Sequence, residues 1–351
     1  MKKTWLVVAV LLLVVMPLAF MSCQRKSEGA STESRGRIAV IRNMENSDHT
    51  AQFFAGAVSE GRSFGYSVDT FMSDGDDIRM QDLMERALLQ NYDIWIVSHA
   101  NAGYQNEIIS RAVRQGVAVS TFDSAGEHVQ GVTYTSQDDA SLAAISLDAI
   151  IEKALANGAT LPIKIIPINI LGFIVPFDNR QAVIDQYVRQ GKIEVLQQIA
   201  PTPGSDYFTV ISTAVRAALT RYRVGEIHGI WSATSFFLDG VIDAIHSAGR
   251  SEIIIAAVDI SDTEIRRLVD TPEYYAIAAV DPYVIGMVNV RIAVSKKLGL
   301  PTPATLQFPA VGVKGDILSR NDNMSTLSNY FSDFGSSDLM MTPELRAARV
   351  R

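Results

Sequence analysis

Cysteine is almost absent from this sequence, with Cys23 as the only one among 351 residues. A single thiol cannot form an internal disulfide. A structural zinc site built from clustered cysteine and histidine also lacks its ligands. We therefore expect neither a disulfide framework nor a metal site, and the informative feature of the cysteine is its position near the N-terminus.

The motifs of common catalytic folds are missing or lack their context. No glycine-rich G-x-G-x-x-G follows the first expected strand, and no P-loop or H-E-x-x-H motif occurs. One G-x-S-x-G string occurs at residues 61–65, but it closes an expected helix and does not lie in the strand-to-helix turn that such a nucleophile needs. Basic residues are outnumbered, with 31 Lys and Arg against 38 Asp and Glu, which gives a net charge of -7. An acidic surface repels phosphate backbones. We predict a protein that is not an enzyme, has no cofactor and does not bind nucleic acid.

The first 23 residues have the order of a bacterial export signal. Lys2-Lys3 provide the positive start, Trp5–Phe20 form an apolar run, and Met21-Ser22 lead to the cysteine. This end resembles a bacterial lipobox, although Phe20 stands where that motif usually has Leu. The resemblance implies that Cys23 is lipidated, as by palmitate, and becomes the mature N-terminus.

A cleaved soluble signal and an uncleaved membrane anchor are the alternatives. A bilayer span needs about 20 apolar residues, and Pro17 interrupts this run. Cleavage before Cys23 would remove two lysines and no acid, which takes the net charge from -7 to -9. The following residues 24–36 are polar and small, so we expect a flexible tether there.

From residue 37 onward, short β-branched runs alternate with longer segments of helical periodicity. The expected strands are Ile38–Arg42, Ser67–Phe71, Ile94–Ser98, Val117–Phe122, Gly131–Thr133, Ile163–Leu171, Ile193–Ile199, Ile227–Ser232, Ile253–Val258 and Ala276–Val280. The expected helices are Thr50–Ser63, Asp77–Gln90, Tyr104–Arg114, Asp138–Ala156, Asn179–Arg189, Tyr207–Tyr222, Phe236–Ala248, Asp262–Leu268 and Tyr283–Lys297.

This alternation predicts an α/β fold. Runs such as Ile94–Ser98 and Ile253–Val258 are apolar on both faces, which is typical of central parallel strands covered by helices. Strand–helix alternation indicates doubly wound sheets, and the length suggests two of them. Ligands of such sheets bind at the carboxyl ends of the strands, so the residues directly after each strand are the candidate site.

Five segments in order carry a family resemblance: RIAVIRNMENSDHTAQFFAGAVSEGRSFGY, QGVAVSTFDSAG, GIWSATSFFLDGVIDAIHSAGR, VDISDTEIRRL and VDPYVIGMVNVRIAV. They resemble the periplasmic substrate-binding proteins of sugar ABC transporters, in the type I family of ribose- and galactose-binding proteins. The resemblance implies two Rossmann-like, doubly wound lobes joined by a three-strand hinge. By this analogy the N-terminal lobe is 37–135 with 281–310, and the C-terminal lobe is 136–280 with 311–351.

The resemblance also implies ligand-binding residues. Asp123 and Asp259 match the two family aspartates that follow strands, and a carboxylate accepts strongly from paired sugar hydroxyls. Ser124 follows the first aspartate. Arg180 matches a ligand-binding arginine whose planar fork suits neighbouring oxygens, with a surface arginine paired to a nearby aspartate as the alternative. Phe177 could stack on a sugar face or belong to the core.

Four further residues complete the candidate site. His49 and Thr50 occupy the loop where relatives place stacking aromatics, and Tyr283 follows the expected hinge. Thr234 stands where the family commonly has Asn, which offers more fixed hydrogen bonds than a hydroxyl. This departure from the family pattern points to a less hydroxylated solute than the usual pentose or hexose.

The resemblance implies a monomeric, lipid-anchored solute-binding protein on the extracytoplasmic face of a bacterial membrane. It would bind a sugar or a similar small polar molecule between its lobes and deliver it to an ABC permease. The alternative is a sensor of the same fold that signals to a membrane kinase or chemoreceptor. The sequence does not separate these two roles, because a docking surface cannot be read from it.

Overall fold

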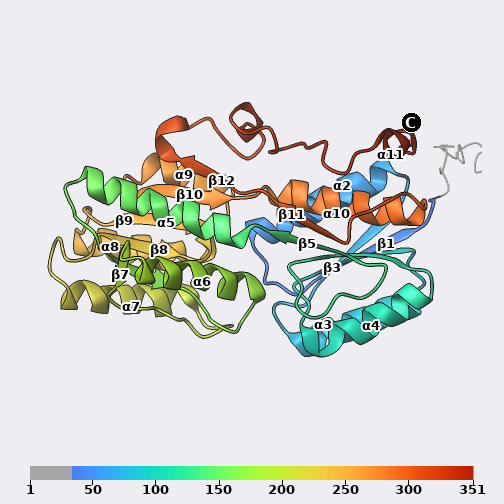
Figure 1. Cartoon of the computed structure of the whole chain (residues 1–351), viewed down its shortest axis with the longest axis horizontal. Coiled ribbons are helices and arrows are strands. Elements are labelled where there is room, and N and C mark those ends of the chain that lie inside the picture. Colours follow the sequence, from blue (N-terminus) through green and yellow to red (C-terminus); the bar gives the residue numbers. More distant parts are fainter. Residues whose placement is uncertain (1–33, 351) are drawn as a thin grey trace, which may run out of the picture. The chain divides into compact units, whose positions relative to one another are not determined.

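Two six-stranded sheets organise the part of the chain that the structure, a computed structural model, describes, namely residues 34–350 (Figure 1). Cys23 and the expected lipobox lie outside the described residues. No helix between residues 34 and 350 is long and apolar enough to cross a bilayer.

The first sheet has the strand order β11-β5-β4-β3-β1-β2, and all its neighbours are parallel. Its strands are β1 (Arg37–Arg42), β2 (Ser67–Met72), β3 (Ile94–Ser98), β4 (Ala118–Phe122), β5 (Thr133–Gln137) and β11 (Thr305–Phe308). Four helices flank it: α2 (Asp48–Ser63), α3 (Asp77–Leu89), α4 (Ala102–Arg114) and α10 (Pro282–Lys297). We call this sheet and its helices the first lobe.

Side-chain alternation in β1 explains why helices cover both faces of this sheet. Ile38 and Val40 pack with α2 and α10 on one face, while Ala39 and Ile41 pack with α3 and α4 on the other. Successive side chains of a strand point to opposite faces, so an all-apolar strand must be covered twice. Figure 1 shows these two helix pairs on opposite sides of the strands.

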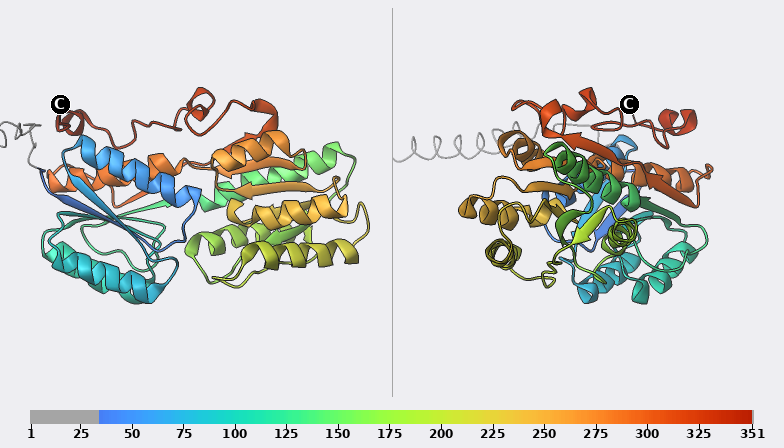
Figure 2. Two further views of the ribbon diagram at one scale, coloured as in Figure 1. Left: turned by 180° about the vertical axis from the view of Figure 1, so that it is seen from behind. Right: turned by 60° about the vertical axis from the view of Figure 1, so that its left-hand side comes forward.

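The second sheet has the order β12-β10-β9-β8-β6-β7 and is parallel except for β12, which runs antiparallel to β10. Its strands are β6 (Ile163–Ile168), β7 (Ile193–Val195), β8 (Gly229–Ser232), β9 (Ile254–Val258), β10 (Tyr274–Ala279) and β12 (Val311–Lys314). Its helices are α5 (Asp139–Ala156), α6 (Val175–Arg189), α7 (Tyr207–Arg221), α8 (Leu238–Ala248) and α9 (Asp262–Asp270). This is the second lobe (Figure 2).

The chain passes between the sheets three times, after β5, after β10 and between β11 and β12. The predicted fold class, two doubly wound lobes joined by three crossing segments, is therefore confirmed. The first crossing follows Gln137, slightly later than the expected position near 134–135. The carboxyl ends of the parallel strands of both lobes face this junction (Figure 2).

Two strands escaped the sequence analysis. β11 and β12 are sheet-edge strands of four residues each, and most of their residues are exposed or half-buried. Such short edge strands have no continuous apolar run, so hydrophobic periodicity does not reveal them. The side chains of Trp95 in β3 and Trp231 in β8 are fully buried in the cores of the two lobes.

Close packing of α2 on α10 fixes the start of α2 at the junction. A side-chain carbon added at Gly56 would lie 2.0 Å from the Tyr283 carbonyl oxygen, and one at Gly286 would lie 2.1 Å from that of Phe53. Only glycine permits two helix backbones to approach this closely. Ser47 caps the same helix by accepting the Thr50 amide at 3.2 Å, so the residues at the start of α2 are held in place.

The end of the chain corrects the assignment of residues 311–351 to the C-terminal lobe. Leu327 and Phe334 do belong to the core of the second lobe. The helix α11 (Pro343–Ala347), however, buries Leu345 in the core of the first lobe, and the Val350 amide donates to Ser63 there. The tail therefore runs across both lobes, as Figure 2 also shows. Its scattered apolar residues gave no periodic signal that could have revealed this.

Candidate functional site

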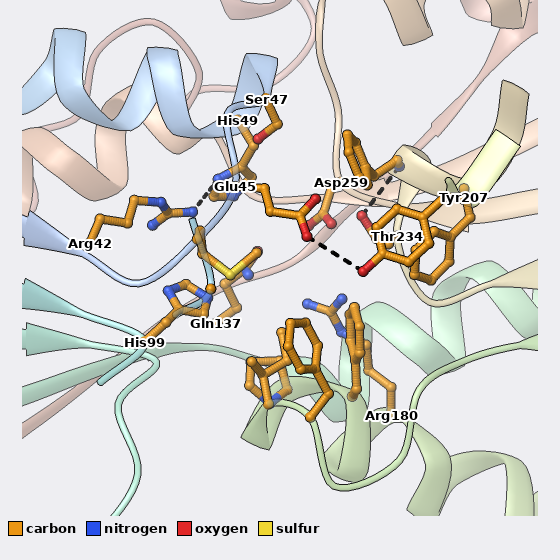
Figure 3. A pocket seen from close by; sticks show the side chains of 18 residues that line it. Arg42, Glu45, Ser47, His49, His99, Gln137, Arg180, Tyr207, Thr234 and Asp259 are labelled. Atoms are coloured by element: carbon orange, nitrogen blue, oxygen red, sulfur yellow. Dashed lines mark hydrogen bonds between the residues drawn. The ribbon is translucent and has the colours of Figure 1, made fainter. Parts of the chain in front are cut away.

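A cavity of about 80 Å³ lies at the carboxyl ends of the strands and is lined by residues of both lobes (Figure 3). The first lobe contributes Arg42, Met44, Glu45, Ser47, His49, Gly75, His99 and Gln137. The second lobe contributes Phe173, Ile174, Pro176, Phe177, Arg180, Tyr207, Thr234, Phe236, Phe237 and Asp259. One water needs roughly 10–15 Å³ by this kind of measure, so the space is that of a small solute.

Arg42, the last residue of β1, organises the first-lobe wall. Its side chain is buried, and its guanidinium donates from Nε to Thr50 Oγ1 at 3.1 Å and from Nη1 to Ser98 Oγ at 2.8 Å. Nη2 lies 3.0 Å from Nδ1 of His49. Burial lowers the Arg42 pKa to about 10, which still leaves the group charged at neutral pH. Three of its donors are thus committed to the protein.

These contacts fix the tautomer of one histidine and the surroundings of a second. Because a guanidinium only donates, His49 Nδ1 must accept from Arg42 and the ring proton lies on Nε2. Ser98 Oγ accepts from Arg42 and lies 2.7 Å from His99 Nδ1, while His99 Nε2 lies 3.8 Å from Asp123 Oδ2. His49 is therefore a hydrogen-bond donor in the cavity wall, and His99 is a second polar ring that lines the cavity.

Burial also keeps these rings neutral. It lowers the pKa of His49 to about 4, and the positive charge of Arg42 acts in the same direction. Burial lowers the pKa of His99 well below 6.5, again with Arg42 adding to the effect. At neutral pH the first-lobe wall therefore presents two neutral imidazoles, of which His49 is a donor through Nε2.

The buried histidines predict a pH-dependent stability. Their folded-state pKa values lie below the unfolded value, so between pH 6.5 and 4 the unfolded chain binds more protons. Folding stability is then lost as the pH falls through this window. We expect His99→Gln to reduce the loss of unfolding free energy between about pH 7 and about pH 5 by roughly 1–2 kcal/mol, measured by chemical denaturation.

His128→Gln is the matched control, because that ring is exposed and does not line the cavity. The raised pKa of Asp123 acts in the opposite direction but is present in every variant. Equal slopes for wild type and His99→Gln would show that His99 is not buried in its neutral form.

Asp259 is the acceptor that faces the cavity. It follows β9 with a positive φ of 74°, a conformation that aspartate tolerates better than most residues. Its carboxylate lines the cavity and receives no hydrogen bond from any residue between 34 and 350. Figure 3 shows it between the Arg42–His49 side and the Tyr207–Thr234 side. It is placed to accept hydroxyl donors of a solute.

Gln137 supplies a second acceptor, while Asp123 lies behind it. The Gln137 amide and Nε2 donate to the two Asp123 carboxyl oxygens at 3.2 and 3.3 Å. Gln137 Oε1 is buried and has no partner among residues 34–350, although a buried carbonyl oxygen normally has one. Burial, with Asp139 nearby, raises the pKa of Asp123 to about 8.

Arg180 is held in a buried ion pair. Nε and Nη2 both lie 3.0 Å from Asp139 Oδ1, and Nη1 donates to the Ala233 carbonyl at 2.6 Å. Neither side chain is more than a few per cent exposed. The charge of Arg180 is thus neutralised by a residue just beyond the first crossing, and not by the nearby aspartates of its own helix.

Five aromatic rings form the second-lobe wall. Phe173 and Phe177 have ring centroids 6.3 Å apart, and Phe177 lies 6.2 Å from Phe237. Tyr207 follows at 5.2 Å from Phe237 and 5.6 Å from Phe236. These separations are those of packed aromatic pairs. The rings therefore form one continuous apolar surface along this side of the cavity.

Two hydrogen bonds join the lobes beside the cavity. The Tyr207 hydroxyl donates to Glu45 Oε1 at 3.5 Å (Figure 3), and Thr263 Oγ1 donates to Asp48 Oδ2 at 3.3 Å. Burial raises the pKa of Glu45. The lobes are thus in contact across the cavity mouth, as in the closed arrangement of a hinged binding protein.

Five of the predicted site residues line this cavity: His49, Phe177, Arg180, Thr234 and Asp259. The other four do not. Thr50 braces Arg42, and Asp123 and Ser124 line a separate cavity of about 320 Å³. Tyr283 packs on the core of the first lobe. These four side chains are therefore not placed to contact a solute in this cavity.

The sequence analysis did not single out several lining residues. Arg42 and His99 stand at the ends of β1 and β3, where the strand-end rule could have found them. Gln137 also ends a strand, β5, but the sequence analysis placed that strand at Gly131–Thr133 and so missed its end. Tyr207 begins a helix after a long loop, and nothing in the sequence marks it as a cavity residue. Between residues 34 and 350, no group of three or more His, Cys, Asp or Glu is arranged to hold a metal ion.

Two hinged lobes with a cavity at their facing strand ends define a solute-binding protein of the closing type. The sequence matches the family described as periplasmic binding protein domain over residues 38–299. The chain belongs to this family, and it has the type I fold that the sequence resemblance predicted.

Solved structures agree with this assignment. A sugar ABC transporter structure from Yersinia enterocolitica is 35% identical, with a TM-score of 0.80, over 89% of this chain and 93% of that one. A 5-methylthioribose transporter solute binding protein from Thermotoga lettingae, in complex with 5-methylthioribose, is 24% identical with a TM-score of 0.79, over 89% and 98% of the chains. Among curated proteins, none matches the sequence.

Proposed function

We propose that this protein is the extracytoplasmic solute-binding lipoprotein of an ABC importer and binds a sugar-like small molecule between its lobes. The observation that carries the proposal is the set of unused polar groups in the cavity wall. Asp259 and Gln137 Oε1 are acceptors without hydrogen-bond partners among residues 34–350, beside the N–H donor of His49 and the neutral ring of His99. Neighbouring donors and acceptors of this kind fit the hydroxyls and ring oxygen of a saccharide.

The relatives support the same class of solute. The Yersinia structure is described as a sugar ABC transporter, and the Thermotoga protein holds 5-methylthioribose. A carbohydrate transporter solute binding protein from Agrobacterium radiobacter holds D-arabinose; it is 17% identical, with a TM-score of 0.70, over 82% and 96% of the chains. On this proposal Cys23 carries the lipid anchor, and an ABC permease receives the solute.

The proposal includes no reaction of the solute. We expect the purified full-length chain, kept in detergent, to bind one sugar-like molecule per chain and to release it unchanged. A thermal-shift screen of sugars, polyols and nucleosides should raise the melting temperature for the true class of solute, because a ligand that binds only the folded state stabilises it. Mass spectrometry of the released solute checks that it is unmodified, and release of an altered product would contradict the proposal.

A further inference from the structure

The cavity is divided into a hydrogen-bonding side and an apolar side. Arg42, His49 and His99 lie on one side in Figure 3, with Tyr207 on the opposite side. Beyond Tyr207, the apolar side includes the rings of Phe173 and Phe236. A fully hydroxylated solute would leave hydroxyls facing the rings of Phe173 and Phe236, which cannot hydrogen-bond them, and burying an unpaired hydroxyl is costly.

The apolar side is more than a stacking platform for one sugar face. The aromatic chain from Phe173 to Phe236 runs through four successive ring contacts. Ile174 and Pro176 add aliphatic surface to it, and Met44 of the first lobe also lines the cavity. Phe236 itself is 44% exposed, although its neighbour Phe237 is buried. Exposed aromatic surface inside a cavity favours an apolar group of the ligand.

The cationic groups of the cavity do not suit a phosphate group bound beside the aromatic rings. Arg180 is paired with Asp139, and Arg42 donates to Thr50, Ser98 and His49. All three nitrogens of each guanidinium already contact protein atoms, whereas recognition of phosphate by arginine uses a pair of available nitrogens. Asp259 adds a negative charge to the lining of the cavity. The part of the solute that faces the aromatic rings is therefore apolar and uncharged.

We infer that the solute is a small sugar that carries an apolar substituent, such as an alkylthio or deoxy-alkyl group, in place of one hydroxyl. This inference rests on the proposed function and narrows it. The hydroxylated end lies between Asp259, Gln137 and the two histidines, and the substituent lies against the aromatic wall. Phe236 is then a residue that determines specificity for the substituent.

Calorimetric titration of the purified full-length chain with ribose, 5-deoxyribose and 5-methylthioribose tests this directly. Burial of each methylene-sized group improves affinity roughly fourfold. We expect 5-methylthioribose to bind about tenfold or more tightly than ribose, with 5-deoxyribose between them. Its binding should also show the more negative heat-capacity change that apolar burial produces.

Variants separate the two ends of the site. Phe236→Ala should weaken 5-methylthioribose about tenfold and ribose less than about twofold, since only the substituent contacts that ring. Phe208→Ala is the matched control, because that ring is 50% exposed and does not line the cavity. The control should change neither affinity.

The outcomes distinguish this inference from the proposed function. Glucose, galactose and arabinose complete the panel of unmodified sugars. If any unmodified sugar binds more tightly than 5-methylthioribose, the inference is wrong while the sugar-binding function stands. If no sugar and no derivative binds, the proposed function fails, and the inference fails with it.

Discussion

Replacing Asp259 with asparagine should weaken solute binding about 10- to 150-fold, because a charge-assisted hydrogen bond contributes about 1.5–3 kcal/mol. The carboxylate lines the cavity and accepts no hydrogen bond from residues 34–350, so its acceptor capacity is available to the solute. Asparagine keeps the size of the side chain but turns one acceptor into a donor. Calorimetric titration with the best ligand of the thermal-shift screen measures the loss.

The same substitution should leave folding intact. Because no described residue depends on the Asp259 carboxylate for a hydrogen bond, the melting temperature of the ligand-free protein should not fall. Asp316→Asn is the matched control, since Asp316 lies in an exposed 3₁₀ turn outside the cavity. Unchanged solute affinity in Asp259→Asn would show that the solute does not use this carboxylate, and that the site has been placed wrongly.

Removing the charge of Arg180 should have the largest effect on stability. Arg180→Met leaves the buried Asp139 carboxylate without its cation, and breaking a buried ion pair in this way costs about 3–5 kcal/mol. The Asn179 amide donates to the same carboxylate at 3.1 Å, but a neutral donor does not replace the charge. Denaturant unfolding of the ligand-free protein measures the difference.

The double variant Arg180→Met with Asp139→Leu tests whether the loss of stability comes from the broken ion pair or from altered packing. Replacing both members of a buried pair by apolar residues is often neutral, so most of the lost stability should return. Asp139→Leu alone should be destabilising as well, because it leaves the guanidinium buried without its carboxylate. A double variant as unstable as Arg180→Met would show that packing at this position, and not the ion pair, carries the stability.

The alternation of strands and helices was readable from the sequence because each central strand is apolar on both faces. Ile38–Ile41 illustrates this, since its residues alternate between two helix-covered faces. The nine expected helices all occur, with small differences at their ends. The edge strands β11 and β12 could not be found in this way, because they are short and half-exposed.

The strand-end rule gave part of the site. It located Asp259 in the cavity, because the residue after a parallel strand faces the ligand edge of the sheet. The same rule placed Asp123 at a strand end as well, but Gln137 stands between it and the cavity-lining residues. The sequence indicates where a strand ends. It does not indicate which side chain from another segment covers the residue at that end.

The sequence by itself determined the two lobes, their doubly wound sheets and the edge that carries the cavity, because these follow from periodicity within single segments. Only the tertiary structure decided how side chains far apart in sequence combine. Arg42 sets the proton position of His49, Asp139 neutralises Arg180, and five rings from three segments make one apolar wall. Such contacts depend on distances between segments, which no local pattern encodes.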